Sequence, residues 1–291
     1  MTRLGRALAL ALVVTPALCL PVGGASRPRV EWRPATPRAG DVAVLEVLET
    51  GPGTTIGGTL GRKPLHFSAH GDRQAAIVGV DLDARPGARP WRIEVRRRGE
   101  LAHTLTGRLT VTARAFSVQR LTLPKEMVEL DPETEQRALA EGAQLRALYR
   151  AITPERLWRG RFGRPVDGGA GSGFGSRRII NGLPRAPHGG VDYSAPTGAP
   201  VFAANRGRVA LVAEFFFAGR LAVLDHGLGL YTLYFHLDSV AVRTGQMVER
   251  GGVLGTVGAT GRATGPHLHF GAQIGDARVD PEILLALDLP E

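Results

Sequence analysis

Apolar residues in the second half of the chain recur in short runs that are separated by glycine-rich connections. These runs are rich in residues that favour strands, and they cover residues 201–204, 207–212, 221–224, 230–237 and 253–257. The connections between them are too short for crossover helices, so neighbouring strands are expected to be antiparallel. The pattern therefore predicts a β domain with little helix over residues 160–285.

A second group of short apolar runs lies nearer the amino terminus. Strand-forming residues cover 41–48, 91–95 and 101–112, and turn signals such as Gly51-Pro52-Gly53 and Pro86-Gly87 come at short intervals. Several short strands with such punctuation are typical of a sandwich. We predict an immunoglobulin-like β-sandwich over residues 28–114, which would target, occlude or simply space the rest of the chain. Its unclustered histidines, His66, His70 and His103, are expected at the surface.

Residues 115–159 have a different pattern and are interpreted as a linker with a helix. Asp131 and Pro132 form a helix start, a capping carboxylate followed by proline at the first helical position. Leu145, Leu148, Tyr149 and Ile152 then follow at helical spacing, and Thr153-Pro154 ends the helix. The stripe is expected to pack on one of the two domains. A pro-segment that blocks a site until it is removed is the alternative.

Residues 1–26 have the pattern of a secretory signal peptide. Arg3 and Arg6 precede an apolar run, and small residues at 23–25 offer a cleavage region. The run is short for a membrane span, and no later stretch qualifies, so no stable membrane insertion is expected after cleavage. An uncleaved anchor is the alternative. The one cysteine, Cys19, lies inside this segment, so the mature chain is predicted to hold no disulfide.

The net charge adds little about partners. The formal charge is +9, and setting aside Arg3 and Arg6 of the signal leaves +7, almost all of it from arginine. Attraction to a polyanion is one interpretation, and a solvated basic surface is the other. No block of basic residues with interleaved aromatics is present, so no nucleic-acid partner is predicted. The sequence does not predict an oligomeric state.

Candidate chemistry begins with His267 and His269. Residues two apart in a strand point to the same face, so both imidazoles are expected to face one pocket while Leu268 packs on the other side. Paired imidazoles on one face suit a transition metal. Upstream, His188 and Asp192 add an imidazole and a carboxylate around two glycines, and His236 lies in a strand-forming run. Spacing does not decide which of these residues would bind the metal.

The ordered combination resembles the lysostaphin/LytM-type zinc metallopeptidases over residues 160–285. The motifs are His-x-x-x-Asp, a Tyr-x-His-Leu strand, and the segment 260–271 that reads Thr-Gly-Arg-Ala-Thr-Gly-Pro-His-Leu-His-Phe-Gly. The resemblance implies one zinc ion per chain, with His188, Asp192 and His269 as its ligands. It also implies His236 and His267 as catalytic histidines that do not bind the metal. The expected architecture is mainly β, with a C-terminal antiparallel β metallopeptidase domain of the LytM type.

The chemistry of such a site favours hydrolysis. Three protein ligands leave zinc one position for water, whose pKa falls to about 7. The helical His-Glu-x-x-His motif is absent, so a histidine is needed to move protons. We therefore expect a secreted or periplasmic zinc endopeptidase that cuts peptides of peptidoglycan, while its preferred bond stays open. A non-hydrolytic cell-wall binding module or amidase activator is the alternative.

Overall fold

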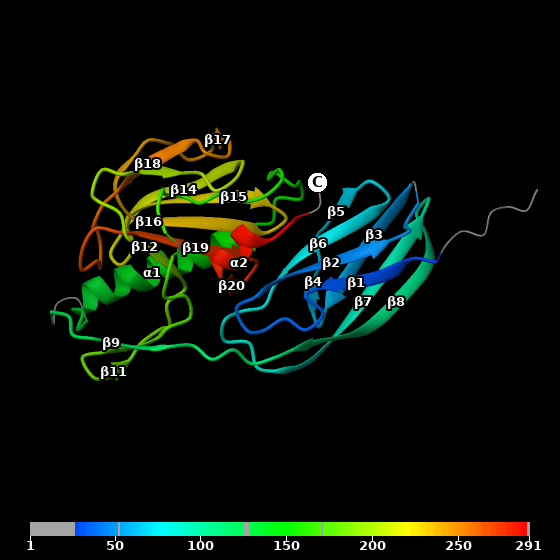
Figure 1. Cartoon of the computed structure of the whole chain (residues 1–291), viewed down its shortest axis with the longest axis horizontal. Helices are drawn as coiled ribbons and strands as arrows, with labels where there is room; N and C mark the ends of the chain where they lie inside the picture. Colours follow the sequence, from blue (N-terminus) through cyan, green and yellow to red (C-terminus); the bar gives the residue numbers. More distant parts are fainter. Residues whose placement is uncertain (1–26, 52, 125–127, 170, 290–291) are drawn as a thin grey trace, which may run out of the picture.

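The computed structural model describes residues 27–289 except 52, 125–127 and 170. The predicted signal segment 1–26, with Cys19, lies outside the described residues. The described residues form a mainly β protein with two helices, and Figure 1 shows the N-terminal sheets on one side and the larger C-terminal sheet on the other. Neither helix combines the length and apolarity that a membrane span requires.

The N-terminal part consists of two antiparallel sheets. The first has the order β1-β2-β6-β5 and the second β4-β3-β7-β8. Their strands are β1 (Arg29–Arg33), β2 (Val42–Leu48), β3 (Thr54–Leu60), β4 (Lys63–Pro64), β5 (Phe67–His70), β6 (Arg73–Gly79), β7 (Gly87–Arg97) and β8 (Glu100–Val111). Leu45 and Val47 of β2 pack with Ile93 and Val95 of β7 in one cluster. The alternation of apolar residues therefore predicted the strands that carry this small core.

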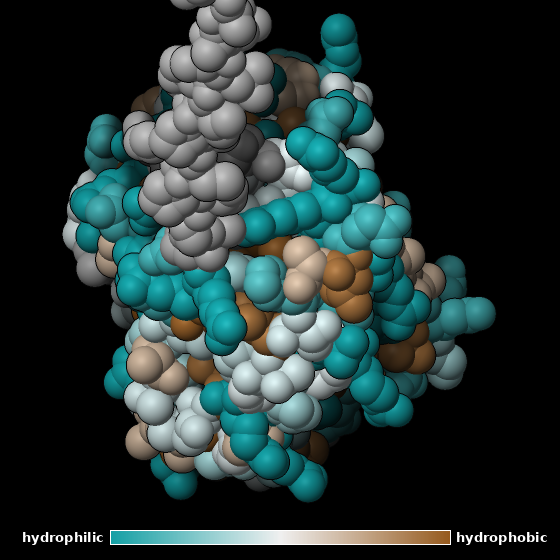
Figure 2. All heavy atoms as spheres, turned by 90° about the vertical axis from the view of Figure 1, so that its right-hand side faces the viewer, coloured by the Kyte–Doolittle hydropathy of each residue, from teal (hydrophilic) through white to brown (hydrophobic). Residues whose placement is uncertain are grey.

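The outer surface of this part is mostly polar. Figure 2 shows hydrophilic side chains over much of the visible face, with hydrophobic ones in small separate groups. The expectation that its histidines are surface residues was wrong for His70, which is 7% exposed. Tertiary packing buries its ring, with Ser68 Oγ 2.8 Å from Nε2 and Arg156 Nη1 3.2 Å from Nδ1. These partners satisfy both ring nitrogens.

The segment between the two parts is joined to the C-terminal part by backbone pairing. Strand β9 (Val118–Leu121) runs parallel to β10 (Arg177–Ile180), which pairs in turn with β11 (Leu183–Pro184). Helix α1 (Pro132–Arg150) lies between β9 and β10 in sequence. The chain therefore leaves β9, forms the helix, and returns to pair beside β9.

Helix α1 begins where the sequence predicts. Asp131 caps it, with Oδ1 accepting a hydrogen bond of 3.0 Å from the Thr134 backbone amide. Leu145, Leu148 and Tyr149 pack against a cluster on the C-terminal sheet, so the expected apolar stripe does contact a domain. The helix ends at Arg150, and Ile152 lies beyond it. Residue 151 already has an extended backbone two residues before Thr153-Pro154.

The C-terminal part is built on a large antiparallel sheet with the order β12-β19-β16-β15-β14-β17. Strand β18 pairs with β13 and β16, and β20 pairs with β19. The elements are β12 (Gly190–Tyr193), β13 (Pro200–Phe202), β14 (Gly207–Phe215), β15 (Gly219–Gly227), β16 (Leu230–Val240), β17 (Met247–Val248), β18 (Val253–Val257), β19 (Leu268–Ile274), β20 (Ala277–Val279) and α2 (Pro281–Ala286). The observed strands confirm the expected antiparallel β fold.

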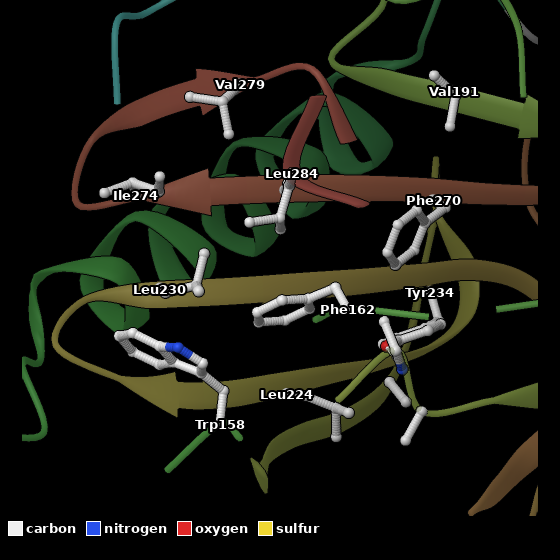
Figure 3. Packing of buried hydrophobic residues seen from close by; sticks show 14 of the residues in the cluster. Trp158, Phe162, Val191, Leu224, Leu230, Tyr234, Phe270, Ile274, Val279 and Leu284 are labelled. Carbon is white, nitrogen blue, oxygen red and sulfur yellow. Dashed lines mark hydrogen bonds between the residues drawn. The ribbon is translucent and has the colours of Figure 1, made fainter. Parts of the chain in front are cut away.

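The two faces of this sheet are covered differently. Figure 3 shows Leu224, Tyr234 and Phe270 pointing into the main core, together with Trp158 and Phe162 from the segment after α1. The opposite face carries the smaller cluster that α1 covers, which includes Tyr231 and Leu233. Because successive strand residues point to opposite faces, Tyr231 and Leu233 lie on the helix side and Tyr234 lies on the core side.

The two parts of the chain share core and polar contacts. Val42 and Leu82 of the N-terminal part belong to the same buried cluster as Ile274 and Val279. Arg278 of β20 donates through Nη2 to Oδ1 of Asp81 and to Oδ2 of Asp83, each at 2.9 Å. Burial alone would lower the pKa of Arg278, but these two carboxylates raise it above its usual value. The contacts hold the N-terminal sheets against the C-terminal sheet.

His226 is a buried histidine outside the five motif residues, and it predicts acid sensitivity of the fold.

 His226 of β15 is fully buried, with Nδ1 2.8 Å from the Arg206 carbonyl oxygen and Nε2 2.8 Å from the Thr232 hydroxyl. Burial lowers the pKa of its ring to about 4, against 6.5 for an ordinary histidine. The unfolded chain therefore binds more protons below pH 6.5, and this contribution to stability is lost as the pH falls from 6.5 towards 4.

We expect the free energy of unfolding to fall by up to about 1.4 kcal/mol per pH unit over this window because of His226. Urea unfolding of the wild type and of His226→Gln, measured in steps from pH 7 to pH 4.5, checks it. The variant should have the flatter pH dependence, whereas His103→Gln on β8 should follow the wild type. Equal slopes for the wild type and His226→Gln would contradict the assignment.

Candidate active site

Strand β19 places His269 between two neighbouring strands. In the register of the sheet, His269 is the partner of Asp192 on β12 and of Phe235 on β16. Partners in register point to the same face of a sheet, so all three side chains lie together. The Phe235 ring stacks on the His269 ring, with centroids 5.3 Å apart and planes 17° apart. Leu268 and Phe270 are buried on the opposite face, as the alternation predicts.

Three polar atoms converge on one point of this face. Nε2 of His188 lies 2.8 Å from Nδ1 of His269, and Oδ1 of Asp192 lies 3.0 Å and 2.9 Å from these two nitrogens. Nδ1 of His188 is 2.9 Å from the Gly173 carbonyl oxygen, to which it donates. Nε2 of His188 therefore carries a lone pair, and this lone pair points towards the two other atoms that could bind a metal. Two imidazoles and a carboxylate with this convergence can hold a metal ion.

The spacing of these atoms fits a small divalent ion. Tetrahedral zinc has ligand bonds of about 2.0–2.1 Å, which place its ligands roughly 3.3 Å apart. The three observed distances are a few tenths of an ångström shorter. Small outward movements of the side chains would therefore create the site. Its donor set of imidazole nitrogen and carboxylate oxygen suits zinc better than magnesium or calcium.

Two glycines bring the backbone close to these rings. A Cβ atom at Gly190 would lie 2.8 Å from Nε2 of His269 and 2.4 Å from the Phe270 carbonyl oxygen. A Cβ atom at Gly173, where φ is +89°, would lie 2.9 Å from Nδ1 of His188. The absence of a side chain at Gly173 thus lets the backbone approach and support His188.

His236 reaches the site because its backbone departs from regular strand geometry. It has φ of +62°, and its amide donates to the Ala218 carbonyl oxygen at 2.8 Å. Regular alternation would turn it to the core side with Tyr234, yet its ring lies 4.7 Å from the His267 ring. A left-handed backbone costs about 1–3 kcal/mol in a residue other than glycine, and such residues cluster at functional sites.

The two histidines beside the three converging atoms have fixed orientations. Nδ1 of His236 lies 2.8 Å from the Thr260 carbonyl oxygen, and Nδ1 of His267 lies 2.8 Å from the Gly265 carbonyl oxygen. A carbonyl accepts only, so each Nδ1 carries a proton and each Nε2 is left with a lone pair. Nε2 of His267 is 3.9 Å from Oδ1 of Asp192. Both rings therefore present a base to the same space.

Electrostatics favour neutral imidazoles around an ionised carboxylate. Burial, together with the neighbouring His269, lowers the pKa of His236 to about 4. Burial also lowers the pKa of His269, against the opposing effect of Asp192. For Asp192, burial alone would raise the pKa, but hydrogen bonds with His188 and His269 hold it well below its usual value. Neutral imidazole and ionised carboxylate are the forms that bind metals.

The structure brings together all five residues that the sequence singled out. His188, Asp192, His236, His267 and His269 surround one space on the helix side of the sheet. Sequence reasoning missed Arg178 of β10, whose Nη2 lies 3.9 Å from Oδ2 of Asp192. It also missed the contribution of α1, whose Leu145 lines a cavity beside His236 and His269. No motif or spacing marked Arg178. The helical spacing of Leu145 predicted that it packs on a domain, but not that it lies beside these histidines.

Comparisons with known proteins agree with this geometry. The family model for Peptidase family M23 matches residues 186–281, a range that contains the five residues. A solved structure from Pseudomonas aeruginosa, assigned to peptidase M23, is 35% identical, with a TM-score of 0.67. The alignment covers 86% of this chain and 95% of that one. The chain belongs to peptidase family M23. The match to nearly the full length of that structure includes the N-terminal sheets as well as the M23 domain.

Curated relatives are similar over part of the chain. Peptidoglycan DD-endopeptidase ShyB of Vibrio cholerae is 41% identical over 120 residues, which are 41% of this chain and 28% of the relative. DD-carboxypeptidase/endopeptidase Mpg of Neisseria meningitidis is 41% identical over 104 residues, or 36% and 24% of the two chains. The chain thus spans about a quarter of the length of these relatives.

Proposed function

We propose that this M23 protein is a zinc metalloendopeptidase that hydrolyses peptide bonds in the stem peptides or cross-links of peptidoglycan. The convergence of His188 Nε2, Asp192 Oδ1 and His269 Nδ1 on one point carries the proposal, because these atoms would form a three-ligand set for one zinc ion per chain. The substrate class is supported by the names of the curated relatives, which include peptidoglycan DD-endopeptidases.

The residues around the three ligands fit a hydrolytic reaction. A zinc ion held there would supply a Lewis acid and make water acidic enough to attack a peptide carbonyl near neutral pH. His188 and His269 would hold the ion as neutral rings, and Asp192 would hold it as a carboxylate. The Gly173 carbonyl fixes the His188 ring by accepting from Nδ1. Such support orients a metal-binding histidine and increases its basicity.

His236 and His267 are proposed as the groups that move protons. Each has Nδ1 bound to a backbone carbonyl and Nε2 directed to the reacting space. One Nε2 would accept a proton from the attacking water, and a protonated Nε2 would return a proton to the leaving amine. When its own Nε2 also carries a proton, the other ring would donate from it to the oxygen that becomes negative during attack. The low pKa of His236, about 4, keeps its ring neutral and ready to accept.

The remaining assignments follow from the same proposal. The two N-terminal sheets over residues 28–114 are proposed to form an immunoglobulin-like sandwich, supported by their facing antiparallel sheets. Residues 115–159 would be the helical linker and residues 160–285 the metallopeptidase domain. The signal pattern of residues 1–26 and the names of the relatives support a place in the bacterial cell envelope, periplasmic or secreted. Peptidoglycan peptides would be the partner.

Metal removal tests the proposal directly. Sacculi treated with the mature protein should release peptide fragments with new amino termini, identified by mass spectrometry. A chelator should abolish release, and added zinc should restore it, because the hydrolytic site is incomplete without its ion. Absence of cleavage by the zinc-loaded protein would contradict the proposal. That result, combined with a gain in amidase activity on the same sacculi, would favour the non-hydrolytic activator.

A further inference from the structure

A cavity of about 230 Å³ lies directly beside the proposed metal ligands. His236 and His269 form one wall, and Leu145 of helix α1 forms another. The cavity is also lined by Phe217, Phe235, Arg178 and Arg262. It therefore combines apolar walls with two guanidinium groups at the position where part of a bound peptide would lie next to the reacting bond.

Arg262 is held in place from both its backbone and its side chain. Its amide donates to the Phe217 carbonyl oxygen at 3.0 Å, and its guanidinium carbon lies 4.1 Å from the centre of the Phe217 ring. A guanidinium stacked on an aromatic face keeps its N–H groups free at the edge of its plane. The side chain is therefore pre-organised, with donors available to a ligand.

Arg178 approaches the same cavity from strand β10. Its side chain is 24% exposed, and its Nε lies 3.3 Å from Oε1 of Gln119. Its Nη2 lies 3.9 Å from Oδ2 of Asp192, which is beyond hydrogen-bonding distance. If Asp192 binds zinc, its negative charge is shared with the ion, so it offsets less of the positive charge on Arg178.

Positive charge at this cavity is in excess of the available carboxylates. Among the described residues, no carboxylate lies within 4 Å of the guanidinium of Arg262. Burial and the nearby Arg178 and Arg185 lower the pKa of Arg262. The carboxylate in the opposite wall, Glu141, already binds Arg137 at 2.7 Å and the Phe216 amide at 2.8 Å. Like charges held together in a partly buried space are unfavourable until an anion joins them.

We propose that Arg178 and Arg262 bind a free carboxylate of the peptide substrate next to the scissile bond. The inference rests on the proposed peptidase function and narrows its substrate class. A cross-link that ends in a D-amino acid with a free carboxylate on the carbon bonded to the scissile nitrogen offers such an anion. A bridge of glycines offers none at that position. Planar guanidinium groups match a carboxylate through paired N–H donors.

The test compares two substrates that differ in one group. Both are synthetic peptides in which D-alanine forms an amide with the amine of a D-amino acid. In one peptide this D-amino acid ends in a free carboxylate, and in the other it ends in a carboxamide. We expect zinc-loaded wild-type protein to prefer the carboxylate by about tenfold or more in kcat/KM, because hydrogen bonds to charged groups are the stronger ones. Arg262→Gln and Arg178→Gln should reduce this preference towards one, while the exposed Arg243→Gln should retain it.

The outcomes separate this inference from the proposed function. Chelator-sensitive cleavage with equal kcat/KM for the two peptides, or with a preference that both arginine variants retain, would overturn the carboxylate site and leave the peptidase intact. If neither peptide is cleaved, calorimetric binding of the same two peptides decides. If the wild type binds the carboxylate peptide more tightly than the carboxamide peptide, and Arg262→Gln does not, the carboxylate site is supported. Equal binding of the two peptides by the wild type overturns it. Zinc content measured for each variant shows whether Arg178→Gln acts through the metal.

Discussion

Replacing Asp192 or His269 by alanine is expected to remove both the bound zinc and the peptidase activity. Their Oδ1 and Nδ1 atoms lie 2.9 Å apart at the point where three donor atoms converge. Residues that only support a metal ligand account for about 10–100-fold in affinity or activity, so loss of a ligand itself should cost at least about a hundredfold. Zinc content of the purified variants and cleavage of sacculi measure the two effects.

A control is needed because His269 is packed between strands. His103→Ala on β8 makes the same change far from the site and should keep zinc and activity. Circular dichroism and thermal unfolding in the presence of a chelator show whether each variant folds without metal. Wild-type zinc content in both Asp192→Ala and His269→Ala would show that these side chains are not the ligands.

Replacing His236 or His267 by alanine is expected to have a different effect, with zinc retained and activity lost. Both rings have Nδ1 bound to a backbone carbonyl and lie beside the ligands without joining the group of three converging atoms. General acid–base groups contribute about 10²–10⁴-fold, so kcat should fall by at least about a hundredfold. Zinc content, KM and kcat on one cross-linked peptide separate a loss of chemistry from a loss of binding.

The result that would contradict these roles is a loss of zinc. If His267→Ala lost metal as His269→Ala does, His267 would act as a ligand. If both variants kept zinc and full kcat, proton transfer would have to come from another group. Because the backbone of His236 is left-handed, His236→Asn is a useful companion, since asparagine tolerates this conformation but is not a general base at neutral pH.

The sequence predicted the face on which the site lies because strand alternation is kept through His267, Leu268 and His269. The capped start of α1 was equally readable, since Asp131 and Pro132 act locally. The orientation of His236 could not be predicted from the sequence. Its left-handed backbone accompanies a hydrogen bond from its amide to the Ala218 carbonyl oxygen. That bond joins β16 to the turn between β14 and β15, which no local pattern reports.

Contacts between distant segments account for the other differences. Arg178 lies near Asp192 only after β10 has paired with β9 and the β12 segment has folded beside it. The buried ring of His70 is in contact with Arg156, which lies far away in sequence. Polar neighbours in sequence predicted exposure, whereas tertiary packing decided burial. The motif identified the chemistry, and the rest of the chain shaped the space around it.

The parallel pairing of β9 with β10 limits how this protein can be shortened. A fragment that starts at residue 160 would lose β9 and leave the backbone groups of Arg177–Ile180 open along one edge. It would also lose α1 and expose the apolar side chains of Tyr231 and Leu233 to water. Open strand edges beside apolar surface promote aggregation. Recombinant catalytic fragments should therefore remain soluble at higher concentration when they begin before Val118.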